Sequence, residues 1–355
     1  MVKLTVGRND SEQRLDRFLR KYLRKAPLSY IYRIIRKDVK VNGSRAKNET
    51  QIMEGDEVTL YMSDADLEKY TGGRAGGNGD SPGPGMTGQG GADGGRRQPA
   101  ARRTFRISYE DENILAAEKP YGLLTHGDSR EKKNTLVNQV TDYLIEKGEY
   151  VPRMERSFSP AAVNRLDRNT TGIVLFGKNA AALRALNSMI RAKDKVSKYY
   201  LTVVCGRLDR ELHLKGSLTK DGRKNMVSIA EEAEEGKQIE TIARPVAYGS
   251  GFTLAEIELI TGRTHQIRAH MASAGFPVAG DSKYGDPSVN RELADRYGLR
   301  AQLLHAYRLH INDAEGSLDY LKGREFHAAM PERQAAVCRK LFGSLEILDK
   351  DKYDS

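Results

Sequence analysis

The sequence contains no tryptophan and only two cysteines, Cys205 and Cys338, among its 355 residues. Two cysteines without metal-like spacing exclude a disulfide framework and fit a reducing compartment. No apolar run approaches the roughly 20 residues that a membrane span needs. The opening residues, MVKLTVGRND, also lack the apolar core of a signal peptide. These absences predict a cytoplasmic protein without a membrane partner.

Acidic residues are outnumbered, with 48 Asp and Glu against 58 Lys and Arg and a net charge of +10. A basic balance favours polyanionic partners such as nucleic acid, although it carries no information about the fold. On composition alone, a merely soluble, positively charged surface explains the excess equally well.

A glycine-rich stretch at residues 71–97 holds almost no large apolar side chain. Such a segment cannot bury enough surface to offset its ordering entropy, so it is expected to be a disordered tether between two domains. The predicted organisation is an N-terminal module at 1–62, a flexible linker at 63–104, a larger catalytic domain at 105–345 and a C-terminal tail at 346–355.

The N-terminal module is predicted to combine two amphipathic helices with short strands. Leu15 and Phe18 recur at helical spacing in the first helix, and Ser29 can cap the second. Residues 39–43 predict a strand that runs into an Asn-Gly turn, and residues 57–61 predict another strand.

Basic side chains are concentrated in this module, where residues 1–62 carry 14 basic and 8 acidic residues. This local excess favours a phosphate-binding face over a solvated helix surface. The candidate RNA-binding residues are Arg14, Arg17, Lys21, Arg33, Arg36, Lys37 and Lys40.

Three segments of the module, RLDRFLRKYL, SYIYRIIRKDVKVNGSRAK and EGDEVTLY, resemble the RNA-binding domain of small-subunit ribosomal protein S-four. The resemblance implies that the two helices and the adjoining turn grip RNA. Similar modules are attached to several enzymes and translation factors, so this one indicates a class of ligand and no reaction.

Beyond residue 105 the pattern alternates between strands and helices. Alternating or continuous apolar runs predict strands at 105–109, 114–119, 173–176, 199–204 and 252–260. Between these strands, apolar residues that recur at helical spacing around Val140 and around Leu186 predict two helices. The predicted fold class is α+β, with flanking helices on a mixed, mostly antiparallel sheet.

The segment NRLDRNTTG, residues 164–172, places Asp167 between two arginines just before a buried strand. Opposite charges nearby favour the ionised form of a carboxylate. An ionised Asp on a rigid loop can act as a nucleophile or stabilise a sugar cation. On this segment alone, an Asp–Arg pair that ties a loop to the sheet is the more common outcome.

The segment TGRTHQIRAHM, residues 261–271, predicts a helix that Thr264 caps. Arg268 lies one turn from Thr264 and can reach back toward a carboxylate or a phosphate. His265 and His270 are five residues apart, so they lie on different helix faces, and no HExxH or CxxC motif accompanies them. The pattern therefore argues against a metal site.

A third segment, Lys198-Tyr199-Tyr200, begins a predicted strand. Strand alternation sends the two tyrosines to opposite faces, so one can pack inside the core while the other lines a cleft. On pattern alone, two core or edge tyrosines are the usual outcome.

In their order and spacing, these motifs resemble the RluA/RluC-type family of large-subunit ribosomal RNA pseudouridine synthases across nearly all of residues 105–343. The segments that carry the resemblance are AEKPYGLLTHG, NRLDRNTTGIVLFGK, KYYLTVVCG and TGRTHQIRAHMASAGFPVAGDSKYG, followed by LLHAYRLHI and EFHAAMPE. The resemblance implies an isomerase that converts uridine in RNA to pseudouridine, with no cofactor and no metal, in a closed apolar pocket.

The resemblance also implies roles for individual residues. They are Asp167 as the catalytic carboxylate, Arg165 as the residue that fills the space of the flipped base, Tyr200 as the active-site tyrosine, Arg268 as the partner of Asp167 and Leu304 as the floor of the uracil pocket. The family's first motif usually begins with His, where this sequence has Asn164. Because the following Arg-Leu-Asp is intact, we interpret Asn164 as a tolerated structural variant.

Two other classes of function stay open at this point. One is a non-catalytic RNA-binding or assembly protein that has kept the fold, for which Asn164 is the hint. The other is a carboxylate-dependent glycosidase, disfavoured because no second Asp or Glu stands out as the acid partner. The appended module favours large-subunit ribosomal RNA over transfer RNA as the partner, and a monomer is expected.

Overall fold

The computed structural model describes residues 1–71, 103–152, 155, 157–221, 226–230 and 236–348. Most of the predicted linker and the last seven residues of the predicted tail, 349–355, lie outside this part. Contacts between Cα atoms divide the chain into two compact units, Met1–Ala100 with Thr141–Pro160 and Ala101–Val140 with Ala161–Ser355. The predicted domain boundaries remain a proposal, since this division groups residues 141–160 with the first unit.

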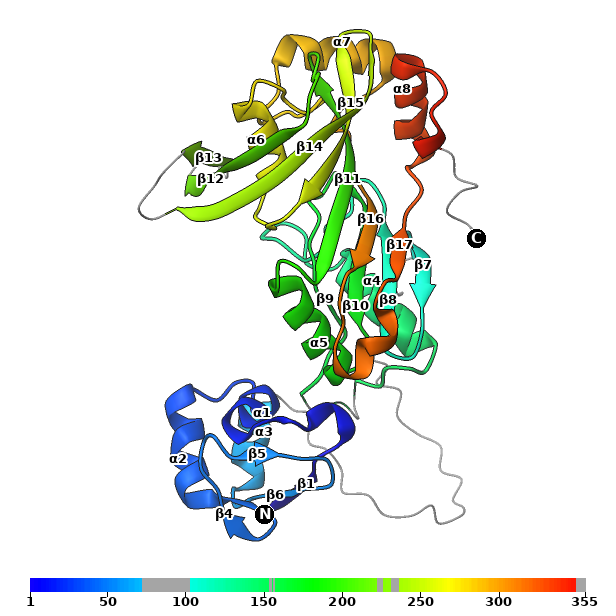
Figure 1. The fold of residues 1–355 in the computed structure, drawn as a ribbon. Helices are drawn as coiled ribbons and strands as arrows, with labels where there is room; N and C mark the ends of the chain where they lie inside the picture. Colours follow the sequence, from blue (N-terminus) through cyan, green and yellow to red (C-terminus); the bar gives the residue numbers. More distant parts are fainter. Residues whose placement is uncertain (72–102, 153–154, 156, 222–225, 231–235, 349–355) are drawn as a thin grey trace, which may run out of the picture. The chain divides into compact units, whose positions relative to one another are not determined.

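The first unit contains a four-stranded antiparallel sheet in the order β1-β6-β3-β4 and a separate β2-β5 pair (Figure 1). Its elements are β1 (Val2–Thr5), η1 (Arg8–Asp10), β2 (Gln13–Arg14), α1 (Leu15–Tyr22), α2 (Leu28–Asp38), β3 (Val39–Val41), β4 (Ser44–Arg45), β5 (Gln51–Ile52), β6 (Glu57–Leu60) and α3 (Asp64–Thr71). Apolar residues of all three helices form one core with the strands, including Phe18, Ile31 and Leu67.

The predicted cap of α2 was wrong by two residues. The helix begins at Leu28 with Pro27 as its N-cap, and no side chain caps it. The Pro27 carbonyl accepts the amide hydrogens of Tyr30 at 3.0 Å and Ile31 at 3.2 Å. Ser29 therefore lies inside the first turn, where its hydroxyl cannot serve as an N-cap.

The predicted Asn-Gly turn lies between β3 and β4. Asn42 and Gly43 both have positive φ, at 51° and 77°. A two-residue type I′ hairpin turn requires this conformation, which Asn and Gly tolerate better than other residues.

α3 occupies the first residues of the segment that was predicted to be a linker. The Ser63 hydroxyl accepts the amide hydrogen of Asp66 at 3.1 Å, which is a side-chain cap. Leu67 is buried in the core, and the rings of Tyr70 and Tyr30 lie 4.4 Å apart. The first unit therefore includes Asp64–Thr71, beyond the predicted end at residue 62.

The second unit contains an eleven-stranded sheet in the order β13-β12-β14-β15-β11-β16-β10-β8-β7, with β17 on β16 and β9 on β10. Its strands are β7 (Arg106–Glu110), β8 (Ile114–Lys119), β9 (Ala161–Ala162), β10 (Thr171–Gly177), β11 (Val196–Cys205), β12 (Leu212–Asp221), β13 (Met226–Ala230), β14 (Lys237–Gly249), β15 (Phe252–Leu259), β16 (Leu304–Ile311) and β17 (Glu325–His327). Only the β10–β16 pair is parallel among these described ladders. The predicted mixed, mostly antiparallel sheet is confirmed.

Helices flank this sheet (Figure 1). They are α5 (Ala180–Arg191), α6 (Gln266–Ser273), α7 (Pro287–Tyr297) and α8 (Glu332–Phe342), with short turns η2 (Gly316–Leu321) and η3 (Glu346–Leu348). A further helix, α4 (Leu136–Glu146), spans the division between the two units. α5 packs against β10 and η2, α6 against β13 and β14, and α8 against β14 and β15. Leu348 of η3 is buried in the core beside α8, so the first residues of the predicted tail are folded. No described helix has the length and apolar character needed to cross a bilayer.

Gly172 makes the parallel pairing of β10 and β16 sterically possible. Its φ is 114°, and a Cβ atom there would lie 2.1 Å from the carbonyl oxygen of Ala306 on β16. Both the backbone conformation and the close approach of the two strands therefore exclude a side chain.

We expect Gly172→Ala to destabilise the second unit by about 3 kcal/mol or more, because β16 must move to admit the methyl group. Gly251→Ala is the matched control, since Gly251 has φ of 82° but nothing within 4 Å of the added Cβ. The control should cost only about 1 kcal/mol of backbone strain. Urea unfolding followed by circular dichroism compares the two, and equal midpoints would contradict the steric argument.

Candidate active site

Three segments that are distant in sequence meet at the first residues of β16. On one side, His305 pairs with Thr171, the first residue of β10, which follows the loop that carries Asp167. On the other side, Leu304 pairs with Thr202 of β11, two residues after Tyr200. The register of the sheet therefore brings the loop before β10 and the middle of β11 to the same place.

A cavity of about 410 Å³ lies at this meeting point, entirely within the second unit. This volume falls within the range of small-molecule sites. Apolar side chains on its wall include Leu166, Leu259, Ile267 and Leu304, and basic side chains include Arg165, Arg191, Lys193, Lys198 and Arg263. The lining is thus mixed, and the prediction of an apolar pocket holds for part of the wall only.

Asp167 is the only carboxylate among the described residues that line this cavity. Its side chain is 26% exposed, and its Oδ2 atom accepts a hydrogen bond from Arg268 Nη1 at 3.0 Å. No hydrogen bond from the described residues reaches Oδ1, which leaves that oxygen available to a ligand.

The two arginines that flank Asp167 in sequence do not supply its counter-charge. Arg168 instead pairs with Asp128 at 3.2 Å, and both side chains are largely exposed. Arg165 is exposed and lines the cavity, as a residue that enters the space of a flipped base requires. The prediction that the adjacent arginines hold Asp167 was wrong: among the described residues its arginine partner is Arg268, as the family resemblance implied.

Arg268 is itself held by a second carboxylate, Asp281. Its Nε and Nη2 atoms donate to the two oxygens of Asp281 at 2.6 and 2.8 Å. The Asp281 side chain is fully buried, and that of Arg268 is 6% exposed. Such a fork-to-fork pair fixes the guanidinium plane, so Nη1 is left to point at Asp167.

The protonation states of this pair follow from burial and hydrogen bonding. Burial acts to raise the pKa of Asp281, but the hydrogen bonds and charge of Arg268 and the amides of Lys283 and Tyr284 lower the pKa overall. Burial likewise acts to lower the pKa of Arg268, and its two carboxylates outweigh that effect. The buried pair is therefore ionised on both sides.

Tyr200 and Leu304, to which the resemblance gives roles, belong to the wall of the cavity. Both are buried. Burial and then the charge of Asp167 raise the pKa of Tyr200, so its phenol stays protonated. The neighbouring Tyr199 faces elsewhere, with the Arg308 guanidinium 4.0 Å from its ring centre. The two tyrosines therefore face opposite sides of the strand, as its alternation predicts.

Residues of the AEKPYGLLTHG motif clamp the loop on both sides of Asp167. The Thr125 hydroxyl donates to the carbonyl of Leu166 at 2.9 Å and accepts its amide hydrogen at 3.2 Å. Lys119 Nζ donates to the carbonyls of Arg168 at 3.0 Å and Leu123 at 2.7 Å. Burial lowers the pKa of Lys119 to about 7, with the charge of Asp167 acting in the opposite direction.

Asn164 serves as a link between the loop and β10. Its Nδ2 donates to the carbonyl of Ile173 at 3.1 Å, and its Oδ1 accepts the amide hydrogen of Leu175 at 2.9 Å. Both ends of the amide are used by the backbone, in keeping with our interpretation of Asn164 as a structural residue.

The start of α6 differs from its prediction. The helix begins at Gln266 with His265 as its N-cap, and Thr264 caps nothing. His265 adopts the left-handed conformation, with φ of 57° and ψ of 15°. The Gln266 side chain holds the turn instead, since its Oε1 accepts the amide hydrogen of Arg263 at 3.1 Å.

Among the described residues, no group of three or more His, Cys, Asp or Glu side chains could hold a metal ion. His270, the second histidine of the motif, lies inside α6 with its Nδ1 atom 2.9 Å from the Thr241 hydroxyl. It is therefore separate from His265, as the five-residue spacing predicts.

The candidate RNA-binding residues belong to the first unit. Arg17, Arg33, Arg36 and Lys37 are exposed on α1 and α2, and Lys21 and Lys40 are half-buried. Arg14 precedes α1 and is already engaged by Asp16, with contacts of 3.1 and 2.8 Å. Their roles remain predictions.

Residues of the site that were not singled out from the sequence include Lys119, Thr125, Asp281 and Tyr284. All lie inside the segments that carry the family resemblance. Asp281 follows Gly280, whose φ is 78° and whose Cβ would lie 2.4 Å from the Ala301 carbonyl. This Gly-Asp pair was the available signal for a tightly packed carboxylate.

Comparisons with known proteins assign the chain to a family. The profile of the RNA pseudouridylate synthase family matches residues 113–273. A protein named ribosomal large subunit pseudouridine synthase C from Haemophilus influenzae is 30% identical over 95% of this chain and 94% of its own length. The protein of the same name from Escherichia coli K12 is 32% identical over 86% of this chain and 87% of its own length.

The fold has a solved counterpart as well. The structure titled human RNA pseudouridylate synthase domain containing 1 superposes with a TM-score of 0.51 at 22% identity, covering 66% of this chain and 86% of that one. The predicted family resemblance is confirmed by the family profile and the two relatives. The chain belongs to the RNA pseudouridylate synthase family, whose members isomerise uridine to pseudouridine in RNA.

Proposed function

We propose that this protein converts specific uridines of large-subunit ribosomal RNA to pseudouridine with Asp167 as its catalytic carboxylate. The observation that carries the proposal is the placement of Asp167, with Oδ2 held by Arg268 and Oδ1 left without a hydrogen bond among the described residues. The relatives from H. influenzae and E. coli, which bear the name of a large-subunit enzyme, support the choice of RNA.

The reaction is an isomerisation, so its atoms balance without a co-reactant. The bond between C1′ and N1 of the uracil breaks while Asp167 attacks or shields the sugar. The uracil turns in the pocket, C5 bonds to C1′, the proton leaves C5, and N1 gains a proton. No redox or hydrolytic step occurs, and the reaction is expected to need no cofactor.

Tyr200 is proposed to stack on the uracil and present a neutral hydroxyl to it. Its raised pKa, caused by burial and the charge of Asp167, keeps that hydroxyl protonated throughout the working range of pH. Leu304, buried at the start of β16, is proposed as the apolar floor under the base. Arg165, exposed at the cavity, is proposed to fill the position that the flipped uridine leaves.

A glycosidase is the weaker assignment. Such an enzyme needs a second carboxyl group as an acid or base, within about 10 Å of the first. The carboxylate nearest in the network, Asp281, is fully buried and bound at both oxygens by Arg268. It can neither reach a substrate nor give up a proton, so hydrolysis lacks its second group.

The first unit is proposed to act as the S-four-like RNA-binding module. Its exposed basic residues on α1 and α2 can contact phosphates, while the chemistry takes place in the second unit. A tether between the two raises the effective concentration of the catalytic cavity near its RNA. The protein is further proposed to work as a cytoplasmic monomer.

Mapping of carbodiimide-reactive pseudouridines in large-subunit RNA, from cells with and without the protein, tests the proposed function directly. Loss of one or a few modified positions is expected when the protein is absent. An unchanged map, with loss of modification in transfer RNA instead, would replace the proposed substrate.

Asp167→Asn should lower the rate of pseudouridine formation by about a thousandfold or more, because the amide is neither charged nor nucleophilic. RNA binding should stay unchanged. Asp295→Asn, which alters an exposed carboxylate on α7, provides the control for the change of charge. Retained activity in Asp167→Asn would reassign the catalytic residue.

The triple variant Arg33→Gln, Arg36→Gln and Lys37→Gln should weaken RNA binding and flatten its salt dependence. Each lost phosphate contact reduces the slope of log affinity against log salt by about 0.7 to 0.9. The rate of the bound complex should not change, since none of these residues lies in the second unit.

The control for this variant removes three charges from exposed positions of the second unit that do not line the cavity: Lys237→Gln, Arg291→Gln and Arg296→Gln. Filter binding at several salt concentrations distinguishes the two proteins. Identical slopes would show that the basic face of the first unit does not contact the RNA backbone.

A further inference from the structure

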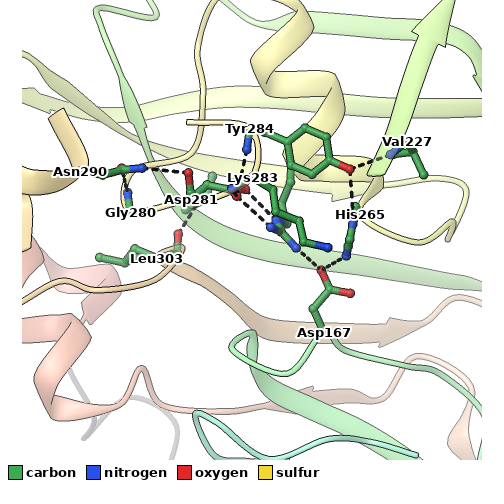
Figure 2. Close-up of polar contacts among 11 residues, drawn as sticks. Asp167, Val227, His265, Gly280, Asp281, Lys283, Tyr284, Asn290 and Leu303 are labelled. Atoms are coloured by element: carbon green, nitrogen blue, oxygen red, sulfur yellow. Dashed lines mark hydrogen bonds and ion pairs between the residues drawn. The ribbon is translucent and has the colours of Figure 1, made fainter. Parts of the chain in front are cut away.

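His265 connects the catalytic carboxylate to the edge strand of the sheet. Figure 2 shows a continuous line of polar contacts that runs from Val227 on β13 through Tyr284 and His265 to Asp167. Neither the proposed reaction nor the family assignment gives this line a role.

The direction of each hydrogen bond follows from the chemistry of the groups. The Val227 backbone N–H can only donate, and it lies 2.9 Å from the Tyr284 hydroxyl oxygen. That hydroxyl therefore accepts from Val227, and its single proton is free to be donated to His265 Nδ1, 3.1 Å away. A neutral His265 ring must then carry its proton on Nε2.

Burial keeps both rings in these protonation states. Burial lowers the pKa of His265, as do the charges of Arg268 and Lys283, while Asp167 acts to raise it. Burial also raises the pKa of Tyr284, so its hydroxyl keeps its proton. At neutral pH the line therefore consists of an amide, a phenol and a neutral imidazole.

The Nε2 atom lies 3.8 Å from Asp167 Oδ2, the oxygen that also accepts from Arg268 at 3.0 Å. At this distance the N–H acts on the carboxylate as a dipole, and a small approach would make it a hydrogen bond. Two donors from the same end of α6 thus converge on Oδ2. Their common target leaves Oδ1 as the oxygen for the sugar.

The backbone at His265 is held in a costly conformation. A left-handed residue other than glycine costs on the order of 1–3 kcal/mol and persists only where its surroundings determine it. The Tyr284 contact and an edge-to-face packing of the two rings, with centres 5.7 Å apart, supply such surroundings. In this conformation the imidazole lies with its Nε2 atom toward Asp167.

β13 is an edge strand, and its contact with Tyr284 is part of its packing onto α6. Val227 is buried in a small apolar cluster with Leu218, Ile239 and Ala269 of α6, against which Tyr284 packs. The docking of the β12–β13 hairpin and the orientation of the Tyr284 hydroxyl are therefore coupled.

We propose that His265 is a positioning residue whose Nε2–H is aimed at Asp167 by Tyr284, and that Tyr284 is in turn oriented by the backbone of β13. The inference rests on the proposed function, since it assigns a role toward Asp167 as the catalytic group. It adds that β13 must be packed against α6 for the Asp167 carboxylate to be oriented for attack.

Two substitutions at one position separate the two ends of the imidazole. His265→Asn keeps an acceptor near Nδ1 and tolerates the left-handed backbone, but it removes the donor toward Asp167. His265→Gln places an amide near Nε2 and removes the link to Tyr284. If positioning is the role, His265→Asn should lower the single-turnover rate about 10- to 100-fold without changing RNA affinity.

The rate is measured as release of tritium from C5 of uridine in a transcript of large-subunit ribosomal RNA. His310→Asn is the matched control, because His310 of β16 pairs with Glu325 of β17 and does not line the cavity. A His265→Asn protein with a lowered melting temperature and a normal rate would reduce His265 to a structural residue and overturn the proposal.

The pH dependence of the rate distinguishes positioning from simple packing. Among the described residues, the ionisable groups that face His265 are Asp167, Arg268, Asp281, Lys283 and Tyr284. In Tyr284→Phe, Nδ1 of the neutral imidazole no longer accepts a hydrogen bond from Tyr284. Because that hydrogen bond favours the neutral ring, the pKa of His265 should rise. Protonated His265 would pair with Asp167, so the acid limb of the rate profile should move to higher pH.

Tyr248→Phe, at an exposed tyrosine of β14, controls for loss of a hydroxyl. In His265→Asn the asparagine does not titrate, so the same Tyr284→Phe change should no longer move the acid limb. An acid limb that Tyr284→Phe leaves in place would contradict the proposed orientation of the ring.

Val227→Pro tests the part of the proposal that concerns β13. Proline removes the amide hydrogen that Tyr284 accepts, and an edge strand tolerates it where that hydrogen faces away from the ladder. We expect a decrease in rate and a shift of the acid limb in the same direction as in Tyr284→Phe. A wild-type rate and pH profile would show that the backbone of β13 does not orient Tyr284.

The outcomes also separate this inference from the proposed function. An inactive Asp167→Asn beside a fully active His265→Asn leaves the proposed function intact and removes the positioning role. A wild-type protein that releases no tritium from any ribosomal or transfer RNA would defeat the proposed function itself.

Discussion

One guanidinium group, that of Arg268, holds two carboxylates, and the geometry of the site depends on it. Its Nε and Nη2 atoms are taken by Asp281, which is fully buried, and its Nη1 atom reaches Asp167 at the cavity. Desolvation of such buried ions costs several kcal/mol each, and good hydrogen-bond geometry has to offset that cost. Here every nitrogen of the group has a carboxylate partner, so the arginine cannot swing away from Asp167.

The chemistry of this arrangement could not be supplied by lysine. An ammonium group is a point charge with rotating donors, whereas the guanidinium fork has a fixed plane that binds one carboxylate with two nitrogens and directs the third. The direction matters because Asp167 has no second strong partner among the described residues. His265, in our proposal, adds a weaker dipole to the same oxygen and completes the orientation.

The loop that carries Asp167 is held by hydrogen bonds from side chains to backbone groups rather than by ion pairs. Thr125 and Lys119 bind the residues on either side of it, and Asn164 ties its start to β10. A carboxylate held in this way loses little further freedom when the nucleotide binds, which is the physical content of preorganisation. Relatives align over up to 95% of the chain, so the likeness includes the basic first unit as well as this site.

Local patterns in the sequence determined the two amphipathic helices and the Asn-Gly turn of the first unit, the mostly antiparallel sheet and the family, because helical spacing, turn residues and motif order are properties of neighbouring residues. Asp167, Arg268, Tyr200 and Leu304 could be named from the family motifs for the same reason. The cap of α2, the helix α3 and the left-handed His265 could not, since single side-chain contacts decided them. Residue spacing by itself favoured the arginines that flank Asp167, and the tertiary structure decided for Arg268, as the family resemblance implied: a pair 101 residues apart depends on the register of β10, β16 and β11, which no spacing in the sequence contains.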